Sequence, residues 1–194
     1  MSWLMKDFNY TNEAFAYATN CFDQTEVQEI IDIGQQLTLS TGELENGVSN
    51  NSVRNCKLSW IQVNDTSSKL FRKLSDIVNS LNSQFYKYDL TEMEDLQYTE
   101  YNSEHNDFYT SHSDDGYKFN LFRKLSVSVQ LSNPDEYQGG ELTFYRNTLS
   151  ECTVAPKEIG TVIVFPSFVI HEVKPIIAGT RKSLVTWVNG PRFK

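Results

Sequence analysis

Two of the three histidines in this chain lie in a pattern that could bind a metal ion. His112 and Asp114 are separated by one residue, and on a strand such side chains share a face because strand side chains alternate. His171 follows much later, after several segments that we expect to be strands. If a distant strand brings His171 to the same place, the three form a 2-His-1-carboxylate set. That set suits non-haem Fe(II) and leaves coordination positions open.

Each part of this pattern also has a simpler explanation when it is taken alone. A histidine and a carboxylate two positions apart are common near strand ends, and residues 111–116 have the composition of a solvated loop. A single histidine such as His171 is also compatible with a hydrogen-bonded position in the core. The relative placement of the three residues along the chain favours the metal site.

A basic residue that could bind an anion comes shortly after His171. Arg181 and Ser183 lie two residues apart at the start of the last apolar segment, so on a strand they point the same way. A planar guanidinium beside a hydroxyl suits a carboxylate. A surface charge near a turn is the alternative, but residues 183–188 are apolar enough for a central strand, where an arginine needs a partner.

The composition limits the classes of protein that this chain can represent. A chain of 194 residues, 39% hydrophobic and 13% aromatic, predicts one folded domain over residues 1–194. The net charge of −8 argues against a general nucleic-acid binder and against binding to membrane surfaces. The three cysteines have no metal-binding or paired spacing, and no segment resembles a signal peptide or membrane span. We therefore expect a soluble cytoplasmic protein, whose oligomeric state the sequence does not define.

Residues 1–95 are expected to form a helical support and a substrate-side loop. Asp23 or Thr25 can cap a first helix, and Thr25 to Gln28 fits a capping box. A second helix starts at residues 65–67 and carries a longer apolar stripe, which we interpret as core packing. The two stripes are Val27, Ile30, Ile31, Gly34 and Leu37, then Leu70, Phe71, Leu74, Ile77, Val78, Leu81 and Phe85. Between the helices, residues 41–55 are polar and are expected to form a loop that closes over the substrate, with an ordinary surface loop as the alternative.

Residues 96–194 change to a period of two and are expected to form a β-rich catalytic core. Ser126, Ser128 and Gln130 share one face of a strand, which suits a polar interior. Turns are expected at residues 138–140 and 177–180. Many short strands with turn signals predict a sandwich or barrel, and a jelly roll is one solution. The expected strands are residues 96–101, 125–131, 141–145, 161–165, 170–174 and 183–188.

The segment from Tyr98 to Pro191 resembles the Fe(II)/2-oxoglutarate-dependent dioxygenases, in particular their prolyl 4-hydroxylase-like branch. The matching motifs follow one another in the family order and together are far more specific than any one of them. They are Tyr109-Thr110-Ser111-His112-Ser113-Asp114, Gly139-Gly140-Glu141-Leu142, Phe165-Pro166-Ser167, His171-Glu172-Val173-Lys174-Pro175 and Gly179-Thr180-Arg181-Lys182-Ser183-Leu184-Val185-Thr186-Trp187.

The resemblance implies a fold and a set of site residues. The fold is a mainly β protein with N-terminal helices around a double-stranded β-helix, or jelly-roll, core. The implied iron ligands are His112, Asp114 and His171. The distal carboxylate of 2-oxoglutarate would pair with Arg181, assisted by Ser183. The implied cosubstrate contacts also include Tyr101 or Tyr109, between which the sequence does not choose, and Gln130, which stands where some relatives have a tyrosine.

The resemblance also implies the reaction and the substrate class. The cofactors would be Fe(II), 2-oxoglutarate and O2, with ascorbate as reductant, and the products would include succinate and CO2. The favoured substrate is a peptidyl residue such as proline, in a peptide or protein that Arg54 and Trp187 would contact. A solvated loop arginine and a core tryptophan are the simpler readings of those two residues. A 2-oxoglutarate oxygenase of a free small molecule and a non-catalytic jelly-roll binding module are the alternatives.

Overall fold

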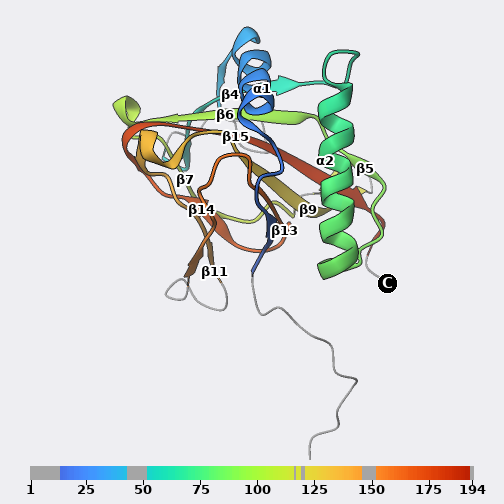
Figure 1. Cartoon of the computed structure of the whole chain (residues 1–194). Coiled ribbons are helices and arrows are strands. Elements are labelled where there is room, and N and C mark those ends of the chain that lie inside the picture. Colours follow the sequence, from blue (N-terminus) through green and yellow to red (C-terminus); the bar gives the residue numbers. More distant parts are fainter. Residues whose placement is uncertain (1–13, 43–51, 116, 119–120, 146–151, 193–194) are drawn as a thin grey trace, which may run out of the picture.

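Two antiparallel sheets dominate the computed structural model (Figure 1). It describes residues 14–42, 52–115, 117–118, 121–145 and 152–192. The mainly β architecture with helices from the N-terminal half confirms the predicted jelly-roll class. The larger sheet has ten strands and the smaller has five. Among the described residues, no helix is both long enough and apolar enough to cross a membrane.

The strand order of the larger sheet brings distant parts of the chain together. In order, its path is β1 (Ala16–Ala18), β13 (Val162–Pro166), β9 (Leu121–Gln130), β15 (Ile176–Gly190), β6 (Leu96–Asn102), β4 (Lys57–Ile61) and β2 (Ser40–Thr41). Three short strands pair with β15 or β9 off this path: β5 (Glu92–Met93), β8 (Tyr117–Lys118) and β10 (Tyr137–Gly139). The long strand β15 is therefore central, as the apolar run after Arg181 predicted.

The smaller sheet carries the two histidine motifs on neighbouring strands. Its order is β12 (Cys152–Val154), β11 (Leu142–Tyr145), β14 (His171–Val173), β7 (Phe108–His112) and β3 (Arg54–Asn55). Residues before position 96 thus supply strands β1 to β5 as well as helices. Residues 43–51, the middle of the expected lid loop, lie outside the described residues, and the described flanks of that loop contribute to β2 and β3.

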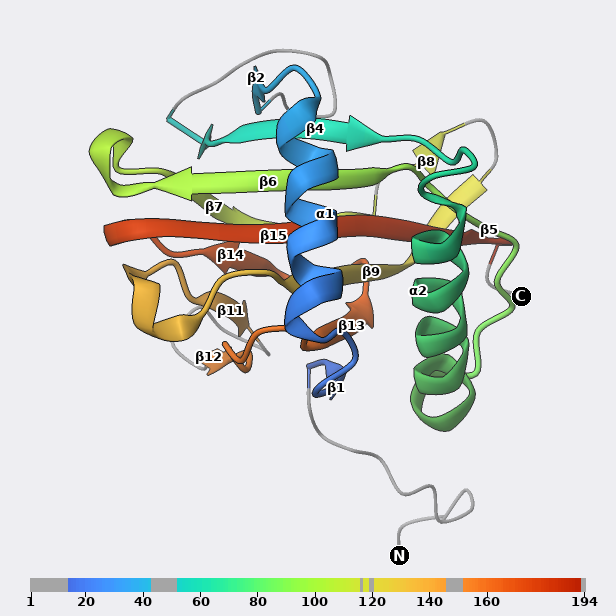
Figure 2. The same ribbon diagram turned by 45° about the horizontal axis from the view of Figure 1, so that its top comes forward.

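Helix α1 (Gln24–Gln36) lies across the outer face of the larger sheet (Figure 2). Its first turn is closed by a capping box in which the Asp23 carboxylate accepts from the Glu26 N–H and the Glu26 carboxylate accepts from the Asp23 N–H. The capping box predicted at Thr25 is therefore wrong, and Asp23 is the N-cap. Val27, Ile30 and Ile31 are buried, as the apolar stripe predicted.

Helix α2 (Ser68–Leu81) lies beside α1 and follows the second predicted stripe. Leu74, Val78 and Leu81 are buried against the sheet. The chain then continues as a single π-helical stretch, Asn82–Tyr86, before it leaves the helix. Because the wider turn breaks the helical spacing, Phe85 is 37% exposed, and its predicted place in the buried stripe is wrong.

The alternation of side chains along β9 separates two buried clusters, one on each face of the larger sheet. Val127 and Val129 pack in the core beneath the helices, whereas Ser126, Ser128 and Gln130 lie on the opposite face of the strand, as predicted. The face that carries Ser126, Ser128 and Gln130 is the inner face, and there the larger sheet packs against the smaller sheet in a second hydrophobic cluster. Its main members are Leu58, Tyr101, Ile163 and Phe165 from the larger sheet and Leu142, Phe144 and Val173 from the smaller.

The two turns expected beside the last strands are partly replaced by strand pairing. Residues 177–180 lie inside β15, where Gly179 pairs with Tyr137 of β10. Gly179 has a φ of +72°, and a Cβ there would lie 2.1 Å from the Glu136 carbonyl oxygen. The glycine therefore serves close strand packing, and the expected free turn at this position is wrong.

Candidate active site

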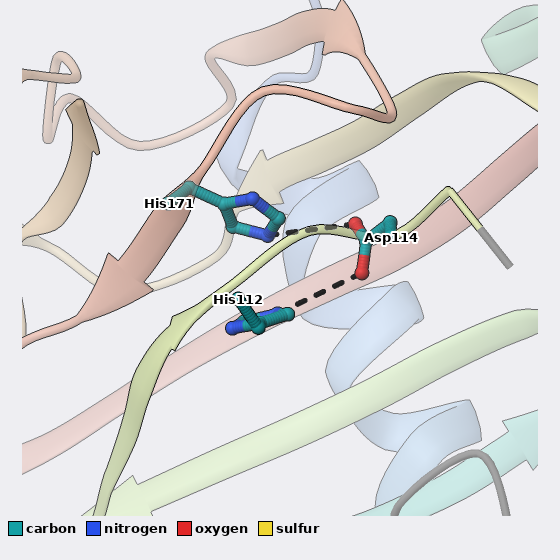
Figure 3. A group of neighbouring side chains, drawn as sticks. All are labelled: His112, Asp114 and His171. Carbon is teal, nitrogen blue, oxygen red and sulfur yellow. Dashed lines mark ion pairs between the residues drawn. The ribbon is translucent and has the colours of Figure 1, made fainter. Parts of the chain in front are cut away.

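Three side chains from two neighbouring strands converge at the end of the smaller sheet. His112 is the last residue of β7 and His171 the first of β14, and the two are paired across the strands. Asp114 follows β7 by two residues, and its backbone N–H donates to the Ser167 carbonyl at 2.7 Å. Figure 3 shows the carboxylate beside the two imidazoles, with one oxygen facing each ring. One potential ligand atom from each residue lies within 4.8 Å of the others.

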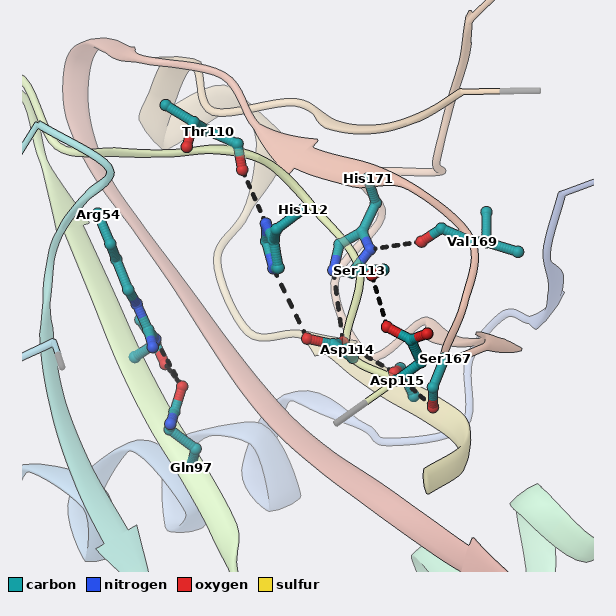
Figure 4. Close-up of polar contacts among 12 residues, drawn as sticks. Arg54, Gln97, Thr110, His112, Ser113, Asp114, Asp115, Ser167, Val169 and His171 are labelled. Atoms are coloured by element: carbon teal, nitrogen blue, oxygen red, sulfur yellow. Dashed lines mark hydrogen bonds and ion pairs between the residues drawn. The ribbon is translucent and has the colours of Figure 1, made fainter. Parts of the chain in front are cut away.

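Both imidazoles are held with the same ring nitrogen pointing inward. Nδ1 of His112 lies 2.7 Å from the Thr110 carbonyl oxygen, and Nδ1 of His171 lies 2.9 Å from that of Val169 (Figure 4). A carbonyl oxygen only accepts, so each Nδ1 carries the proton and each Nε2 presents a lone pair. Nε2 lies 3.6 Å from Asp114 Oδ1 in His112 and 3.4 Å from Oδ2 in His171.

Asp114 is oriented by a hydroxyl on the larger sheet. Ser126 donates to Asp114 Oδ2 at 2.8 Å, and the Ser126 and Ser167 hydroxyls lie 3.1 Å apart. The indole N–H of Trp187 also faces this carboxylate, although it makes no close hydrogen bond within the described part of the chain. Sequence reasoning placed Ser126 on the polar face of its strand but assigned it no role. The sequence does not show which residue of β9 lies opposite Asp114, so this contact could not be predicted.

The electrostatics of His112 and Asp114 favour the protonation states that a cation requires. Burial, with the neighbouring His171, lowers the pKa of His112 to about 4. Burial by itself raises the pKa of Asp114, but His171 and His112 outweigh it and lower that pKa below its usual value. At neutral pH His112 is therefore neutral and Asp114 is charged, as a metal ligand set needs to be.

Arg181 lies in the interior between the sheets and is 1% exposed. Its Nη2 donates to Gln130 Oε1 at 3.0 Å, and its Nη1 lies 3.5 Å from Ser183 Oγ. Its guanidinium carbon lies 5.7 Å from the centre of the Tyr101 ring, on the strand paired with β15. A Cβ at Gly140 would lie 2.2 Å from Ile176 Cδ1 and 3.1 Å from Arg181 Cδ, so the second glycine of the Gly139-Gly140 motif makes room for both side chains.

The residues present fit Fe(II) and 2-oxoglutarate. The three ligand atoms are close enough to share one ion, and their types match the facial set of non-haem iron. Arg181 has a buried charge without a carboxylate partner among the described residues, and its Nε lacks any hydrogen-bond partner there. A buried cation of this kind calls for an anionic ligand, which a distal carboxylate supplies.

The two candidate tyrosines occupy different parts of the site. Tyr101 is buried opposite Arg181, and burial raises the pKa of its phenol, so it remains a hydrogen-bond donor. Tyr109 instead stacks on the His112 ring, with centroids 3.6 Å apart. The neighbour of Arg181 is therefore Tyr101, and the neighbour of His112 is Tyr109.

The residues predicted to contact substrate are more buried than a surface groove would require. Arg54 is 6% exposed, donates to Gln97 Oε1 at 2.6 Å (Figure 4) and lies 4.7 Å from the Tyr109 ring centre. Trp187 is 7% exposed and lies beside Trp60, which is 44% exposed. Substrate contact by Arg54 and by Trp187 therefore stays a prediction, and Trp60 is the more accessible of the two indoles.

Part of the chain is similar in sequence to curated PKHD-type hydroxylases. A PKHD-type hydroxylase of Prochlorococcus marinus is 35% identical over 80 residues, which are 41% of this chain and 35% of that protein. One from Colwellia psychrerythraea is 36% identical over 84 residues, 41% of this chain and 36% of that protein. The matched region therefore spans about a third of the length of these curated relatives.

Solved structures show the same fold over almost the whole chain. A prolyl hydroxylase from Trichoplax adhaerens, in complex with a hypoxia inducible factor peptide fragment, superposes with a TM-score of 0.74 at 25% identity. That match covers 91% of this chain and 84% of the other. A Pseudomonas putida prolyl-4-hydroxylase gives a TM-score of 0.72 at 17% identity and covers 94% and 95%.

The family model of the 2OG-Fe(II) oxygenase superfamily matches residues 96–189. This range extends from strand β6 into strand β15. It contains His112, Asp114, His171 and Arg181. Residues 96–189 therefore belong to the 2OG-Fe(II) oxygenase superfamily.

Proposed function

We propose that this protein is an Fe(II)- and 2-oxoglutarate-dependent hydroxylase of a peptidyl residue, with proline as the leading candidate. The observation that carries the proposal is the pairing of His112 with His171 around Asp114, with Arg181 buried on the inner face of the opposite sheet. The peptide seated in the Trichoplax adhaerens prolyl hydroxylase supports a peptide substrate.

The chain's own residues have defined tasks in this reaction. His112, Asp114 and His171 would hold the iron, which supplies oxidation of a C–H bond coupled to conversion of 2-oxoglutarate and O2 into succinate and CO2. The Thr110 and Val169 carbonyls fix the imidazole tautomers, and Ser126 fixes the carboxylate. Arg181 would neutralise and orient the distal carboxylate of the cosubstrate.

A turnover assay with Fe(II), ascorbate and 2-oxoglutarate tests the proposal against a library of proline-containing peptides. We expect succinate formation to be stimulated by a subset of peptides, each of which gains the mass of one oxygen atom. Stimulation by free amino acids but by no peptide would support the small-molecule alternative. Absence of succinate under all conditions would support a binding module without catalysis.

The histidines of the chain provide matched variants for this assay. His171→Ala should abolish turnover and sharply weaken Mn(II) binding, because one of three metal ligands is lost. His105→Ala removes an exposed histidine from the short helix Ser103–His105 and should leave both unchanged. Full activity of His171→Ala would refute the assignment of the triad.

A further inference from the structure

A row of polar side chains crosses the inner face of the larger sheet beside Arg181. Gln130 of β9 pairs with Ser183 of β15, and the register of β9 against β13 places Thr161 opposite Gln130 on the other side. The backbone N–H of Gln130 donates to the Thr161 backbone carbonyl at 3.0 Å, so the pairing of the two strands extends to Thr161. Side chains directly opposite one another in an antiparallel pair are neighbours on the same face.

Strand alternation places the Thr161 side chain in the interior between the sheets. Val162 and Val164 pack in the core beneath the helices, whereas Ile163 and Phe165 pack in the cluster between the sheets. Thr161 precedes Val162 and so shares the face of Ile163 and Phe165. It is fully buried, with an exposure of 0%.

The amide of Gln130 is already engaged with the protein. Its Nε2 donates to the Pro156 carbonyl at 2.8 Å, and its Oε1 accepts from Arg181 Nη2 at 3.0 Å. Gln130 therefore ties the guanidinium of Arg181 to the loop that leads into β13. This geometry makes Gln130 a residue that positions Arg181, in contrast to the direct cosubstrate contact expected from the sequence.

Two buried polar atoms near this row lack hydrogen-bond partners within the described ranges. They are Thr161 Oγ1 and Arg181 Nε. Buried polar groups are nearly always satisfied, and the free energy cost of leaving them unpaired points to a ligand or an ordered water. A hydroxyl donor and a guanidinium donor facing the same interior suit the two oxygens of one carboxylate.

We infer that Thr161 donates a hydrogen bond to the distal carboxylate of 2-oxoglutarate, as a partner of Arg181, while Gln130 positions Arg181 without touching the cosubstrate. The inference rests on the proposed function and identifies the third polar group that completes the distal carboxylate site. An ordered water bonded to Thr161 is the competing explanation, and binding measurements separate the two.

The test compares Thr161→Val, which keeps the shape and removes the hydroxyl, with Thr161→Ser, which keeps the hydroxyl. Isothermal titration calorimetry of the Mn(II)-loaded protein measures the dissociation constants of 2-oxoglutarate and of oxalate, which chelates a metal but has no distal carboxylate. We expect Thr161→Val to weaken 2-oxoglutarate binding about tenfold, as for the loss of one hydrogen bond to a charged group. Oxalate binding should not change, and Thr161→Ser should bind both like the wild type.

Gln130→Met should produce the same selective loss, because a freed guanidinium is no longer held in place. Gln130→Glu should weaken 2-oxoglutarate binding further, because the new carboxylate would occupy Arg181 itself. Both variants should bind oxalate like the wild type, a selectivity that general damage to the fold would not give. Equal effects on oxalate and 2-oxoglutarate would overturn the positioning role.

The outcomes distinguish this inference from the proposed function. A Thr161→Val variant that binds 2-oxoglutarate as tightly as the wild type would overturn the Thr161 contact alone. Equal weakening of oxalate and 2-oxoglutarate by Thr161→Val would overturn it as well. A wild-type Mn(II) protein that binds no 2-oxoglutarate would overturn the proposed function together with this inference. If Thr161→Val does not fold, Thr161→Ala can replace it in the comparison with Thr161→Ser.

Discussion

The Ser126 hydroxyl on the larger sheet donates a 2.8 Å hydrogen bond to the Asp114 carboxylate, which follows a strand of the smaller sheet. This contact links the two sheets at the metal triad. It is the one described side-chain hydrogen bond from the larger sheet to a triad residue. The orientation of the carboxylate therefore depends on how the two sheets pack against one another.

The first prediction concerns this contact. Ser126→Ala should weaken Mn(II) binding by about 10–100-fold, the usual effect of removing a partner of a metal ligand. Calorimetric titration without cosubstrate measures it. Ser128→Ala is the matched control, since Ser128 is buried on the same face of β9 but has no described hydrogen bond to the triad. Equal metal affinity of both variants would show that Ser126 does not orient Asp114.

The second prediction concerns the anion partner in the interior. Arg181→Ala should cost about 2–5 kcal/mol in 2-oxoglutarate binding, because a buried carboxylate loses its charged partner. Mn(II) affinity should change far less. Lys182→Ala removes the neighbouring charge from the opposite face of β15 and should leave 2-oxoglutarate affinity unchanged. If Lys182→Ala weakened 2-oxoglutarate binding and Arg181→Ala did not, the cosubstrate would bind on the other face of β15.

The third prediction concerns Arg54. Arg54→Met should lower the free energy of unfolding by about 1–3 kcal/mol, because the buried side-chain oxygen Oε1 of Gln97 loses its charged donor and keeps only the longer contact of 3.4 Å from the Thr99 hydroxyl. Denaturant unfolding measures this, and Arg72→Met on the exposed face of α2 should stay within about 0.5 kcal/mol of the wild type.

The same Arg54 variant tests substrate contact. If Arg54 touches the peptide, Arg54→Met should still convert 2-oxoglutarate slowly without peptide but lose the stimulation that peptide gives. Stimulation at the wild-type level would leave Arg54 with a structural role alone and move the substrate-binding surface elsewhere.

The fourth prediction concerns pH. His112 has a pKa of about 4 in the folded protein, against 6.5 as its ordinary value, so between these pH values only the unfolded chain binds a proton there. The stability of the metal-free protein should therefore fall as the pH drops below 6.5, by about 2 kcal/mol at pH 5. Urea unfolding at pH 7 and pH 5 with a chelator measures this. His112→Gln should remove most of the difference in the free energy of unfolding between pH 7 and pH 5. His105→Gln should leave that difference unchanged.

The sequence by itself determined the main features of both the fold and the site. Strand alternation is local, so it correctly separated Val127 and Val129 from Ser126 and Gln130. The apolar stripe of α2 likewise identified Leu74 and Val78 as core residues. The types and order of His112, Asp114 and His171 identified a triad that the structure brings together.

Tertiary structure alone decided which residues support that triad. Ser126 reaches Asp114, and Thr161 lies opposite Gln130, because of the register between strands that are far apart in the sequence. Local periodicity defines the face of a side chain but not its neighbours across a sheet. The choice of neighbour for Arg181 was open between Tyr101 and Tyr109 for the same reason. The pairing of β15 with β6 placed Tyr101 there and left Tyr109 stacked on His112.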